Sequence, residues 1–180
     1  MKQFPLSASI RLGRVDEFDR IRRFYHEVTD GLQGAKFVIP WVKDIYPAPD
    51  DIASALERGD LFLGEVSDSY ASAMVLNFLA NESYDTVHWD SGIPQEECMV
   101  LHMLGVHPRF QRRGLAGQMI EEAKVIGRRE GARAIRLDVL KGNTPAERLY
   151  PKHGFRLVEE AILYYEDTGW TDYLMYELLL

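Results

Sequence analysis

Cysteine and long apolar runs are scarce in this chain of 180 residues. The single cysteine, Cys98, excludes an internal disulfide, so we expect a reduced thiol in a cytoplasmic protein. No stretch approaches the roughly 18 uninterrupted apolar residues of a membrane span, and residues 1–10 lack the apolar run of a secretion signal. We therefore expect neither membrane insertion nor export.

Positive charge is the second quantity in short supply. The 21 lysines and arginines are outnumbered by 28 acidic residues, which gives a formal net charge of −7. That balance disfavours nucleic acid as a partner and suits a cationic ligand. The five histidines and Cys98 show no spacing typical of metal ligands, so we expect no metal site.

The chain also lacks a segment rich in Pro, Gly or Ser that would indicate a linker between two domains. The length and the 46% hydrophobic content suffice for one domain with a substantial core. We therefore predict a single domain over residues 1–180.

The hydrophobic pattern changes repeatedly between the period of a strand and that of a helix, which predicts an α/β (α+β) fold. The strands at 98–106 and 134–140 are joined by a helix and should run parallel, whereas the other pairs should be largely antiparallel. Two irregular segments, 31–51 and 81–97, carry aromatic residues. In chain order we expect a strand at 7–13, a helix from Asp16 to Thr29, a helix at 51–58, hairpin strands at 60–66 and 70–80 with Asp68 and Ser69 in the turn, a strand at 98–106, a helix at 115–129, a strand at 134–140, a short helix within 143–154, and strands at 155–166 and 172–180.

Three arginines gather in the stretch VHPRFQRRGLAG, residues 106–117, of this otherwise acidic chain. A helix that begins at Leu115 leaves the N–H groups of Arg112 to Ala116 without intrahelical partners and places its positive end there. Gly114 and Ala116 would let an anion approach the main chain. The pattern predicts a diphosphate site, although a solvated basic turn fits the bare pattern equally well. The G-x-G-x-x-G fingerprint of dinucleotide sites and the Gly-Lys-Ser/Thr of a P-loop are both missing.

Two motifs stand in order along the chain. The run LHMLGVHPRFQRRGLAGQMIEEAK resembles the central motif of the GNAT superfamily of N-acetyltransferases, and NTPAERLYPKHGF, about 30 residues later, resembles that family's next motif. The order of expected strands and helices is also the family's order. Two departures are small: Ala116 stands where glycine is commoner, and Pro151 follows Tyr150, where we expect it to alter the end of the short helix.

The resemblance implies the GNAT fold, a mixed and mostly antiparallel sheet of about seven strands flanked by about four helices, with splayed central parallel strands. It also implies that the anion is the pyrophosphate of acetyl-CoA and that the pantetheine arm pairs with the strand end at 104–106. Gly105 fits an irregularity there, either a bulge or a close backbone approach. Asn143 would hydrogen-bond the arm from the other side. The expected cosubstrate-binding residues are Leu104, Gly105, Val106, Gln111, Arg112, Arg113, Gly114, Leu115, Ala116, Gly117 and Asn143.

Acetyl transfer to an amine requires a neutral nucleophile, and an alkylamine of pKa about 10.4 costs roughly 4–5 kcal/mol to deprotonate at pH 7. A base, or water leading out of the site, must take that proton. Alternation along the strand at 98–106 places His102 on one face with Leu104 and Val106. The resemblance implies that this titratable group is a candidate base, although a core histidine bonded to a backbone carbonyl is an equally good interpretation. Glu97, Glu65 and solvent are rivals for this role. The resemblance implies that Tyr150 is the general acid that protonates the departing thiolate.

The expected function is acetyl transfer from acetyl-CoA to a primary amine of a small molecule, directly within a ternary complex. Two alternatives stay open: an acceptor that is a protein N-terminus or lysine, and a non-catalytic module that senses acyl-CoA. A homodimer is also left open. The residues expected to wall the acceptor site or to attract a cation there are Trp41, Tyr46, Tyr84, Trp89, Asp44, Asp50, Asp85 and Asp90.

Overall fold

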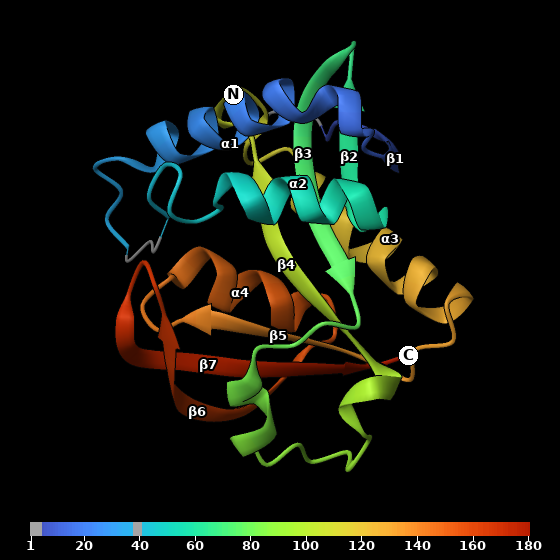
Figure 1. Cartoon of the computed structure of the whole chain (residues 1–180), viewed down its shortest axis with the longest axis vertical. Coiled ribbons are helices and arrows are strands. Elements are labelled where there is room, and N and C mark those ends of the chain that lie inside the picture. Colours follow the sequence, from blue (N-terminus) through green and yellow to red (C-terminus); the bar gives the residue numbers. More distant parts are fainter. Residues whose placement is uncertain (1–4, 38–40) are drawn as a thin grey trace. The chain divides into compact units, whose positions relative to one another are not determined.

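The computed structural model describes residues 5–37 and 41–180. In these residues it contains seven strands, four α-helices and four short 3₁₀ turns (Figure 1). The strands and α-helices are β1 (Ser9–Leu12), α1 (Phe18–Leu32), α2 (Pro49–Arg58), β2 (Leu61–Val66), β3 (Ser69–Asn77), β4 (Cys98–Val106), α3 (Leu115–Arg129), β5 (Ala134–Leu140), α4 (Thr144–Lys152), β6 (Arg156–Tyr165) and β7 (Gly169–Leu179).

The strands are hydrogen-bonded in the order β1-β2-β3-β4-β5-β7-β6. The β1–β2, β2–β3, β5–β7 and β6–β7 ladders are antiparallel, whereas β4 and β5 form the parallel pair that the sequence predicts. The parallel ladder joins residues 98–100 to residues 134–136, in strands nine and seven residues long. Pairing is thus confined to the beginnings of the two strands, as the splayed arrangement requires. The predicted fold class is confirmed.

The chain folds into two compact units, and each is described in its own right. The first unit contains residues 5–34, 41–76 and 102–122, and the second contains residues 35–37, 77–101 and 123–180. The arginine-rich stretch that follows β4 lies in the first unit. Tyr150 and Asn143 lie in the second unit.

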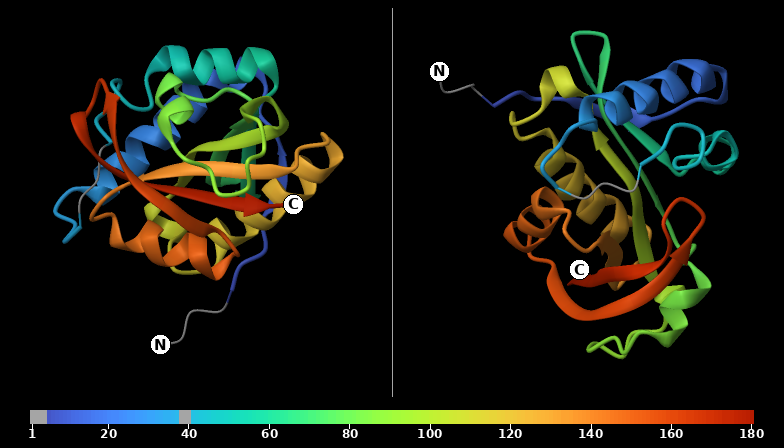
Figure 2. Two further views of the ribbon diagram at one scale, coloured as in Figure 1. Left: turned by 90° about the horizontal axis from the view of Figure 1, so that it is seen from below. Right: turned by 90° about the vertical axis from the view of Figure 1, so that its left-hand side faces the viewer.

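The first unit has helices on both faces of its strands. Alternate residues of β2 point to opposite faces. Leu61 and Leu63 join the buried cluster that includes residues of α1 and α2, and a Cβ added to Gly64 would lie 3.2 Å from Met119 Sδ in α3. Figure 2 shows α1 and α2 on one side of these strands and the beginning of α3 on the other.

The second unit is centred on a buried arginine of β5. Arg136 is 1% exposed and pairs with Glu177 of β7 at 3.0 Å. Its guanidinium also donates to Gln95 Oε1 at 3.0 Å and to the carbonyl of Ile93 at 2.7 Å, and it lies 4.2 Å from the ring centroid of Trp89. A buried charge is tolerated only when it is paired in this way. The contacts fix the segment at 89–95 to the sheet of this unit.

Two predicted helix boundaries are wrong at α1. A 3₁₀ turn at Val15–Glu17 precedes the helix, and Glu17 accepts the main-chain N–H of Arg14 at 2.9 Å. Asp16, where we expected the helix to begin, instead accepts a hydrogen bond from the Arg14 side chain at 3.1 Å. The helix also passes the predicted end at Thr29 and reaches Leu32, because Leu32 still packs against the buried cluster.

The turn of the β2–β3 hairpin lies one residue earlier than predicted. Ser67 and Asp68 take φ values of 49° and 61°, and Ser69 already pairs with Val66 in the ladder. Two positive φ values are typical of the two-residue turns that match the twist of a hairpin, and Asp tolerates this conformation. The prediction of Asp68 and Ser69 as the turn is therefore wrong by one position.

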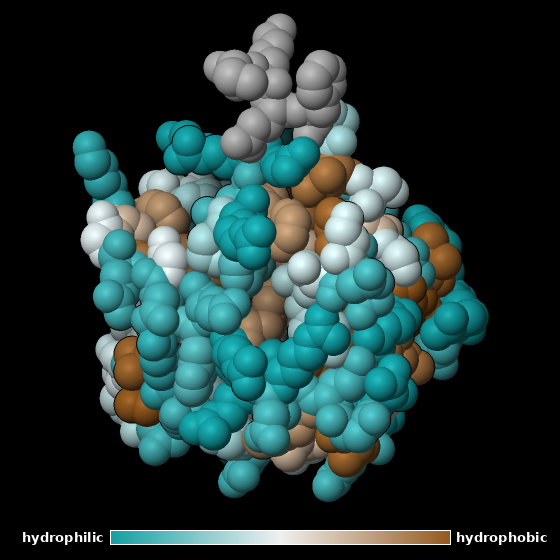
Figure 3. Space-filling model, turned by 90° about the horizontal axis from the view of Figure 1, so that it is seen from above, coloured by the Kyte–Doolittle hydropathy of each residue, from teal (hydrophilic) through white to brown (hydrophobic). Residues whose placement is uncertain are grey.

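Hydrophilic side chains dominate the face of the molecule shown in Figure 3, and hydrophobic ones occur there in small patches. Exposed large hydrophobic side chains include Ile162, Tyr164 and Trp170 of the β6–β7 hairpin. Across the part of the chain that the structure describes, no helix combines the length and the apolar character needed to cross a bilayer.

Candidate active site

A short connection with unusual backbone conformations joins β4 to α3 in the first unit. A 3₁₀ turn at Pro108–Phe110 comes first, and the Gln111 side-chain amide then donates to the carbonyl of Val106 at 3.3 Å. Arg112 and Gly114 take φ values of 60° and 85°, in the left-handed region that favours glycine. We call residues 107–114 the glycine loop.

Helix α3 begins directly after the glycine loop, as predicted. The first α-helical hydrogen bond runs from the N–H of Gln118 to the carbonyl of Gly114, at 3.1 Å. The N–H groups of Leu115, Ala116 and Gly117 consequently have no acceptor within the helix. A Cβ added to Gly114 would meet nothing within 4 Å, so the space beside this residue is open. The helix end therefore offers N–H donors and its positive dipole end to an anion.

The N-terminal segment holds the glycine loop from the other side. Leu6 donates its N–H to the carbonyl of Arg113 at 3.1 Å. The side-chain amide of Gln118 accepts the N–H of Ala8 at 2.9 Å and donates to the carbonyl of Leu6. Sequence reasoning missed this contact, and no local signal could have found it, because its partners stand more than 100 residues apart.

Strand β4 is distorted just before its end. Met103 has a φ of 54°, a conformation typical of a bulge, and its carbonyl accepts a hydrogen bond from the buried hydroxyl of Tyr25 at 3.0 Å. His102, the candidate base, is half-buried immediately before this distortion. Alternation along β4 is therefore interrupted at Met103. Gly105, for which we expected a bulge or a close approach, shows the close approach, because a Cβ there would lie 3.2 Å from the ring of Trp41.

Tyr150, the candidate acid, lies on α4 in the second unit and is 8% exposed. Its ring packs edge-on against Phe155, with centroids 5.4 Å apart, and lies 6.2 Å from the ring of Tyr176. Burial, and next the charge of Asp138, raise the pKa of the Tyr150 phenol well above its ordinary value. The hydroxyl is therefore protonated at neutral pH. Pro151 does not end the helix, which continues to Lys152.

Asn143 is the N-cap of α4. Its side-chain Oδ1 accepts the N–H of Ala146 at 3.5 Å, and its own N–H donates to the carbonyl of Leu140 at 3.0 Å. Such a cap satisfies one of the N–H groups that a helix start leaves without partners. The amide nitrogen, rather than the oxygen, is then the group of Asn143 suited to binding a ligand carbonyl.

Asp138 of β5 is the carboxylate that sequence reasoning missed in the second unit. The hydroxyls of Tyr84 and Tyr165 donate to its two oxygens, at 3.2 and 2.8 Å. We call these three residues the Asp138 cluster. A sequence signal was present, since Asp138 interrupts the apolar strand AIRLDVL, but the tyrosines that bind it come from distant segments.

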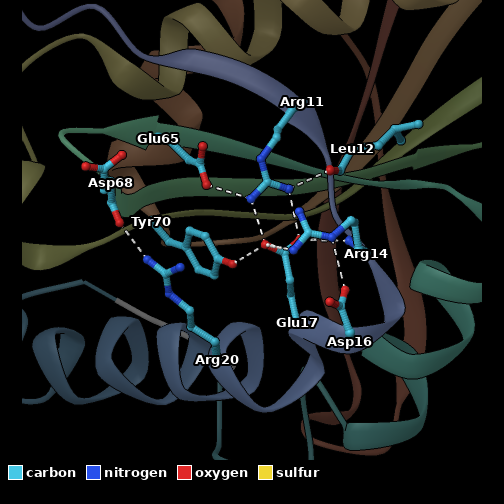
Figure 4. Close-up of polar contacts among 9 residues, drawn as sticks. All are labelled: Arg11, Leu12, Arg14, Asp16, Glu17, Arg20, Glu65, Asp68 and Tyr70. Carbon is cyan, nitrogen blue, oxygen red and sulfur yellow. Dashed lines mark hydrogen bonds and ion pairs between the residues drawn. The ribbon is translucent and has the colours of Figure 1, made fainter.

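The two carboxylates considered as rival bases are both paired with arginine. In the first unit, Arg11 Nη2 lies 2.6 Å from Glu65 and 2.7 Å from Glu17 (Figure 4). In the second unit, Arg133 lies 2.7 Å from Glu97. If Glu65 or Glu97 accepted a proton, its ion pair with arginine would be broken. Both are weaker candidates for the base than the sequence alone indicates.

The residues expected around the acceptor are largely engaged within their own units. Tyr84 is 1% exposed, and the ring of Trp89 faces the buried arginine of β5. Asp44 accepts hydrogen bonds of 2.8 Å from Arg22 and lies 2.7 Å from His26, and these contacts, Arg22 first, lower its pKa. Trp41 and Tyr46 pack against the core of the first unit, whereas Asp50, Asp85 and Asp90 are exposed.

Comparison with known proteins decides the family. Residues 38–155 match the model of the acetyltransferase (GNAT) family. This chain belongs to that family. No curated protein matches the chain significantly.

Solved GNAT structures resemble this chain along almost all of its length. An acetyltransferase of the GNAT family from Streptococcus agalactiae matches with a TM-score of 0.76 at 21% identity, covering 96% of this chain and 95% of its own. A protein from Salmonella typhimurium, described as an acetyltransferase and solved with its cofactor acetyl-CoA, matches with a TM-score of 0.68 at 16% identity, covering 97% and 95%. The ribosomal-protein-S18-alanine N-acetyltransferase of Escherichia coli matches with a TM-score of 0.67 at 19% identity, covering 96% and 93%.

Membership of the GNAT family makes this protein an acyltransferase whose cosubstrate is acetyl-CoA. At such low identities the neighbours show that the fold is shared. They do not identify the acceptor on which this chain acts.

Proposed function

We propose that this GNAT transfers the acetyl group of acetyl-CoA to a primary amine of a small molecule, directly within a ternary complex, in the cytoplasm and as one catalytic domain. The observation that carries the proposal is the glycine loop, where an open helix N-terminus follows two left-handed residues. That arrangement suits a diphosphate, which is the anionic part of acetyl-CoA.

The main chain of residues 111–117 would bind the pyrophosphate. Arg112 and Arg113 supply positive charge beside it, in a chain whose net charge is −7. The pantetheine arm would lie along β4 at Leu104, Gly105 and Val106, as an added strand does. The side-chain amide nitrogen of Asn143 would donate to the arm.

Tyr150 would act on the departing sulfur. A phenol of ordinary pKa about 10 is a weaker acid than a thiol of pKa about 8.5, so complete transfer to a free thiolate runs uphill by about 2 kcal/mol. Burial and Asp138 increase this difference, because they raise the pKa of Tyr150. The phenol is therefore suited to donate a hydrogen bond as charge develops on sulfur, and to pass the proton while the C–S bond breaks.

His102 would accept the amine proton, directly or through one water. An imidazole is a suitable base near neutral pH. The arginine pairs of Glu65 and Glu97 support this assignment, because they make its two carboxylate rivals weaker candidates. Solvent remains the competing proton acceptor, and a mutation of His102 separates the two.

Direct transfer is favoured over a covalent acyl-enzyme by the state of the only cysteine. Cys98 is buried, and burial raises the pKa of its thiol to about 11. Its Sγ–H donates to the carbonyl of Pro94 at 3.3 Å. Because the thiolate is the nucleophile, a thiol that stays protonated at neutral pH is a poor carrier for an acyl group.

An acceptor screen tests the proposal. The full chain is incubated with acetyl-CoA and a panel of primary amines, together with peptides that have free N-termini or lysines, and released CoA thiol and product mass are measured. We expect acetylation of a small amine. Product on peptides alone would replace the small molecule by a protein acceptor, and acetyl-CoA binding without product on any acceptor would support a sensing module.

A further inference from the structure

An indole ring stands against the backbone near the end of β4. A Cβ added to Gly105 would lie 3.2 Å from Cη2 and 3.3 Å from Cζ3 of Trp41, closer than ordinary van der Waals contact. Val28 of α1 lies 3.6 Å from the same position, so the ring covers the face of β4 that carries α1. Gly105 permits this approach because it has no side chain.

The ring of Trp41 contacts two aromatic neighbours. Its centroid lies 5.8 Å from the ring of Tyr25 and 6.1 Å from that of Tyr46, both in edge-on geometry. Tyr25 is itself bound to β4, since its hydroxyl donates to the carbonyl of Met103. The indole is therefore fixed to the strand and not merely close to it.

The residues that follow Trp41 anchor the same segment to α1. Asp44 binds Arg22 through two hydrogen bonds of 2.8 Å, and Lys43 lies 2.6 Å from Asp30. Because Arg22 and Asp30 stand about two turns apart on one helix, the segment is held at two points. Each exposed pair is weak alone, but together they restrict the movement of the segment.

The position of the acyl group follows from the direction of the arm, and this step rests on the proposed function. An arm that starts at the glycine loop passes Val106 first and reaches Leu104 last. Its thioester end would then lie at Leu104, directly next to Gly105, against which Trp41 stands. We propose that Trp41 sets the length of the acyl chain that this enzyme accepts, admitting acetyl and excluding longer acyl groups by contact with the indole.

Replacement of Trp41 by Phe is the matched test, because Cη2 and Cζ3 belong to the outer ring that Phe lacks. The space opened by this change should allow a longer acyl chain to be buried. Each added methylene should then raise the affinity for the acyl-CoA about fourfold. For butyryl-CoA, with two more methylenes than acetyl-CoA, we expect the ratio of its kcat/KM to that of acetyl-CoA to rise by about 15-fold. Trp41→Leu is a second variant in case Trp41→Phe repacks. Tyr46→Leu is the control, since Tyr46 contacts Trp41 but is not among the atoms nearest Gly105.

Acetyl-, propionyl- and butyryl-CoA are compared by calorimetry and by acyl-CoA hydrolysis, neither of which needs the acceptor. A rise in the butyryl-to-acetyl ratio for both Trp41 variants, with Tyr46→Leu unchanged, supports the proposal. An unchanged ratio in the folded Trp41 variants overturns it, as does an equal rise in Tyr46→Leu. A change in the range of amines accepted at constant acyl ratio also overturns it, and assigns Trp41 to the acceptor. A shifted ratio without acetylation of any amine leaves the acyl assignment standing and refutes the proposed function instead.

Discussion

The glycine loop and the Asp138 cluster are built by opposite means. The loop is made of main chain, with Arg112 and Gly114 in left-handed conformations before a helix start. The cluster is made of side chains, with two tyrosine hydroxyls on one carboxylate whose charge also acts on Tyr150. A site made of main-chain groups keeps its binding through most side-chain substitutions. It loses binding when the backbone changes conformation or when a side chain blocks the ligand's approach to it. A side-chain site can fail through the loss of one atom.

The largest effect should come from blocking the main-chain site. We expect Gly114→Glu to abolish acetyl-CoA binding and leave the fold intact, because the carboxylate would stand where phosphates meet the helix end. One like-charge pair at about 4 Å costs about 4 kcal/mol at an effective dielectric constant of 20, or about 10³-fold in affinity. Calorimetry checks this. Gly114→Ala is the control, since it brings the strain of the 85° φ without charge and should keep most of the affinity. Near-native CoA affinity in folded Gly114→Glu would refute the phosphate-binding role of the loop.

The next effect concerns His102, at the distorted end of β4. If it takes the amine proton, His102→Gln should lower the chemical step by about 10²–10⁴-fold and remove an acidic limb from the pH profile of kcat/KM. Gln keeps hydrogen-bonding capacity but is not a base in this range. Single-turnover rates of the variant and the wild type, measured across a range of pH, check this prediction. A variant that is only less heat-stable, with the wild-type profile retained, would reassign His102 to the core and leave proton removal to Glu97, Glu65 or solvent.

The loss of a single atom tests Tyr150, on which the charge of the Asp138 cluster acts. Tyr150→Phe keeps the ring and its packing on Phe155 and Tyr176 and removes the hydroxyl. We expect turnover to fall by about 10²-fold with little change in acetyl-CoA affinity, which is the reverse of the Gly114→Glu result. Steady-state kinetics and calorimetry on the same preparation separate the two. Unchanged turnover, with chemistry shown to be rate-limiting, would make Tyr150 a packing residue.

The smallest effect is on stability and appears only in acid. Hydrogen bonds from Arg11 lower the pKa of Glu17 to about 2, with Tyr70 also contributing (Figure 4). A carboxylate with a depressed pKa stabilises the fold above the unfolded pKa of about 4.3, and this contribution is lost as pH falls towards 2. The loss should reach at most about 3 kcal/mol. Asp167 of the second unit has a pKa raised by burial, so its contribution has the opposite sign.

Urea unfolding at pH 6, 4 and 3 measures how much free energy of unfolding is lost on acidification. Glu17→Gln should lessen the loss of stability on acidification, whereas Asp16→Asn, a change at an exposed neighbour, should behave like the wild type. If Glu17→Gln retains the full pH dependence, other carboxylates are responsible for it.

The sequence predicted what depends on local pattern and missed what depends on distant partners. Spacing and conformational preference predict three local features: the left-handed conformation at Gly114, the helix start at Leu115 and the parallel pairing of β4 with β5. The fold class follows from these features. The distortion at Met103 was not foreseeable, because methionine has no preference for positive φ. The Asp138 cluster was missed for another reason, since Tyr84 and Tyr165 stand 54 and 27 residues from Asp138.

The hold of the N-terminal segment on the glycine loop has a consequence for biosynthesis. Ala8 is made 110 residues before Gln118, to which it is hydrogen-bonded. At the usual 5–20 residues per second, the beginning of the chain waits about 5–20 s on the ribosome before its partner has been synthesised. Closing so long a loop is slow compared with forming a local helix. The glycine loop should therefore be completed late in folding, after α3 and β4 have left the ribosome.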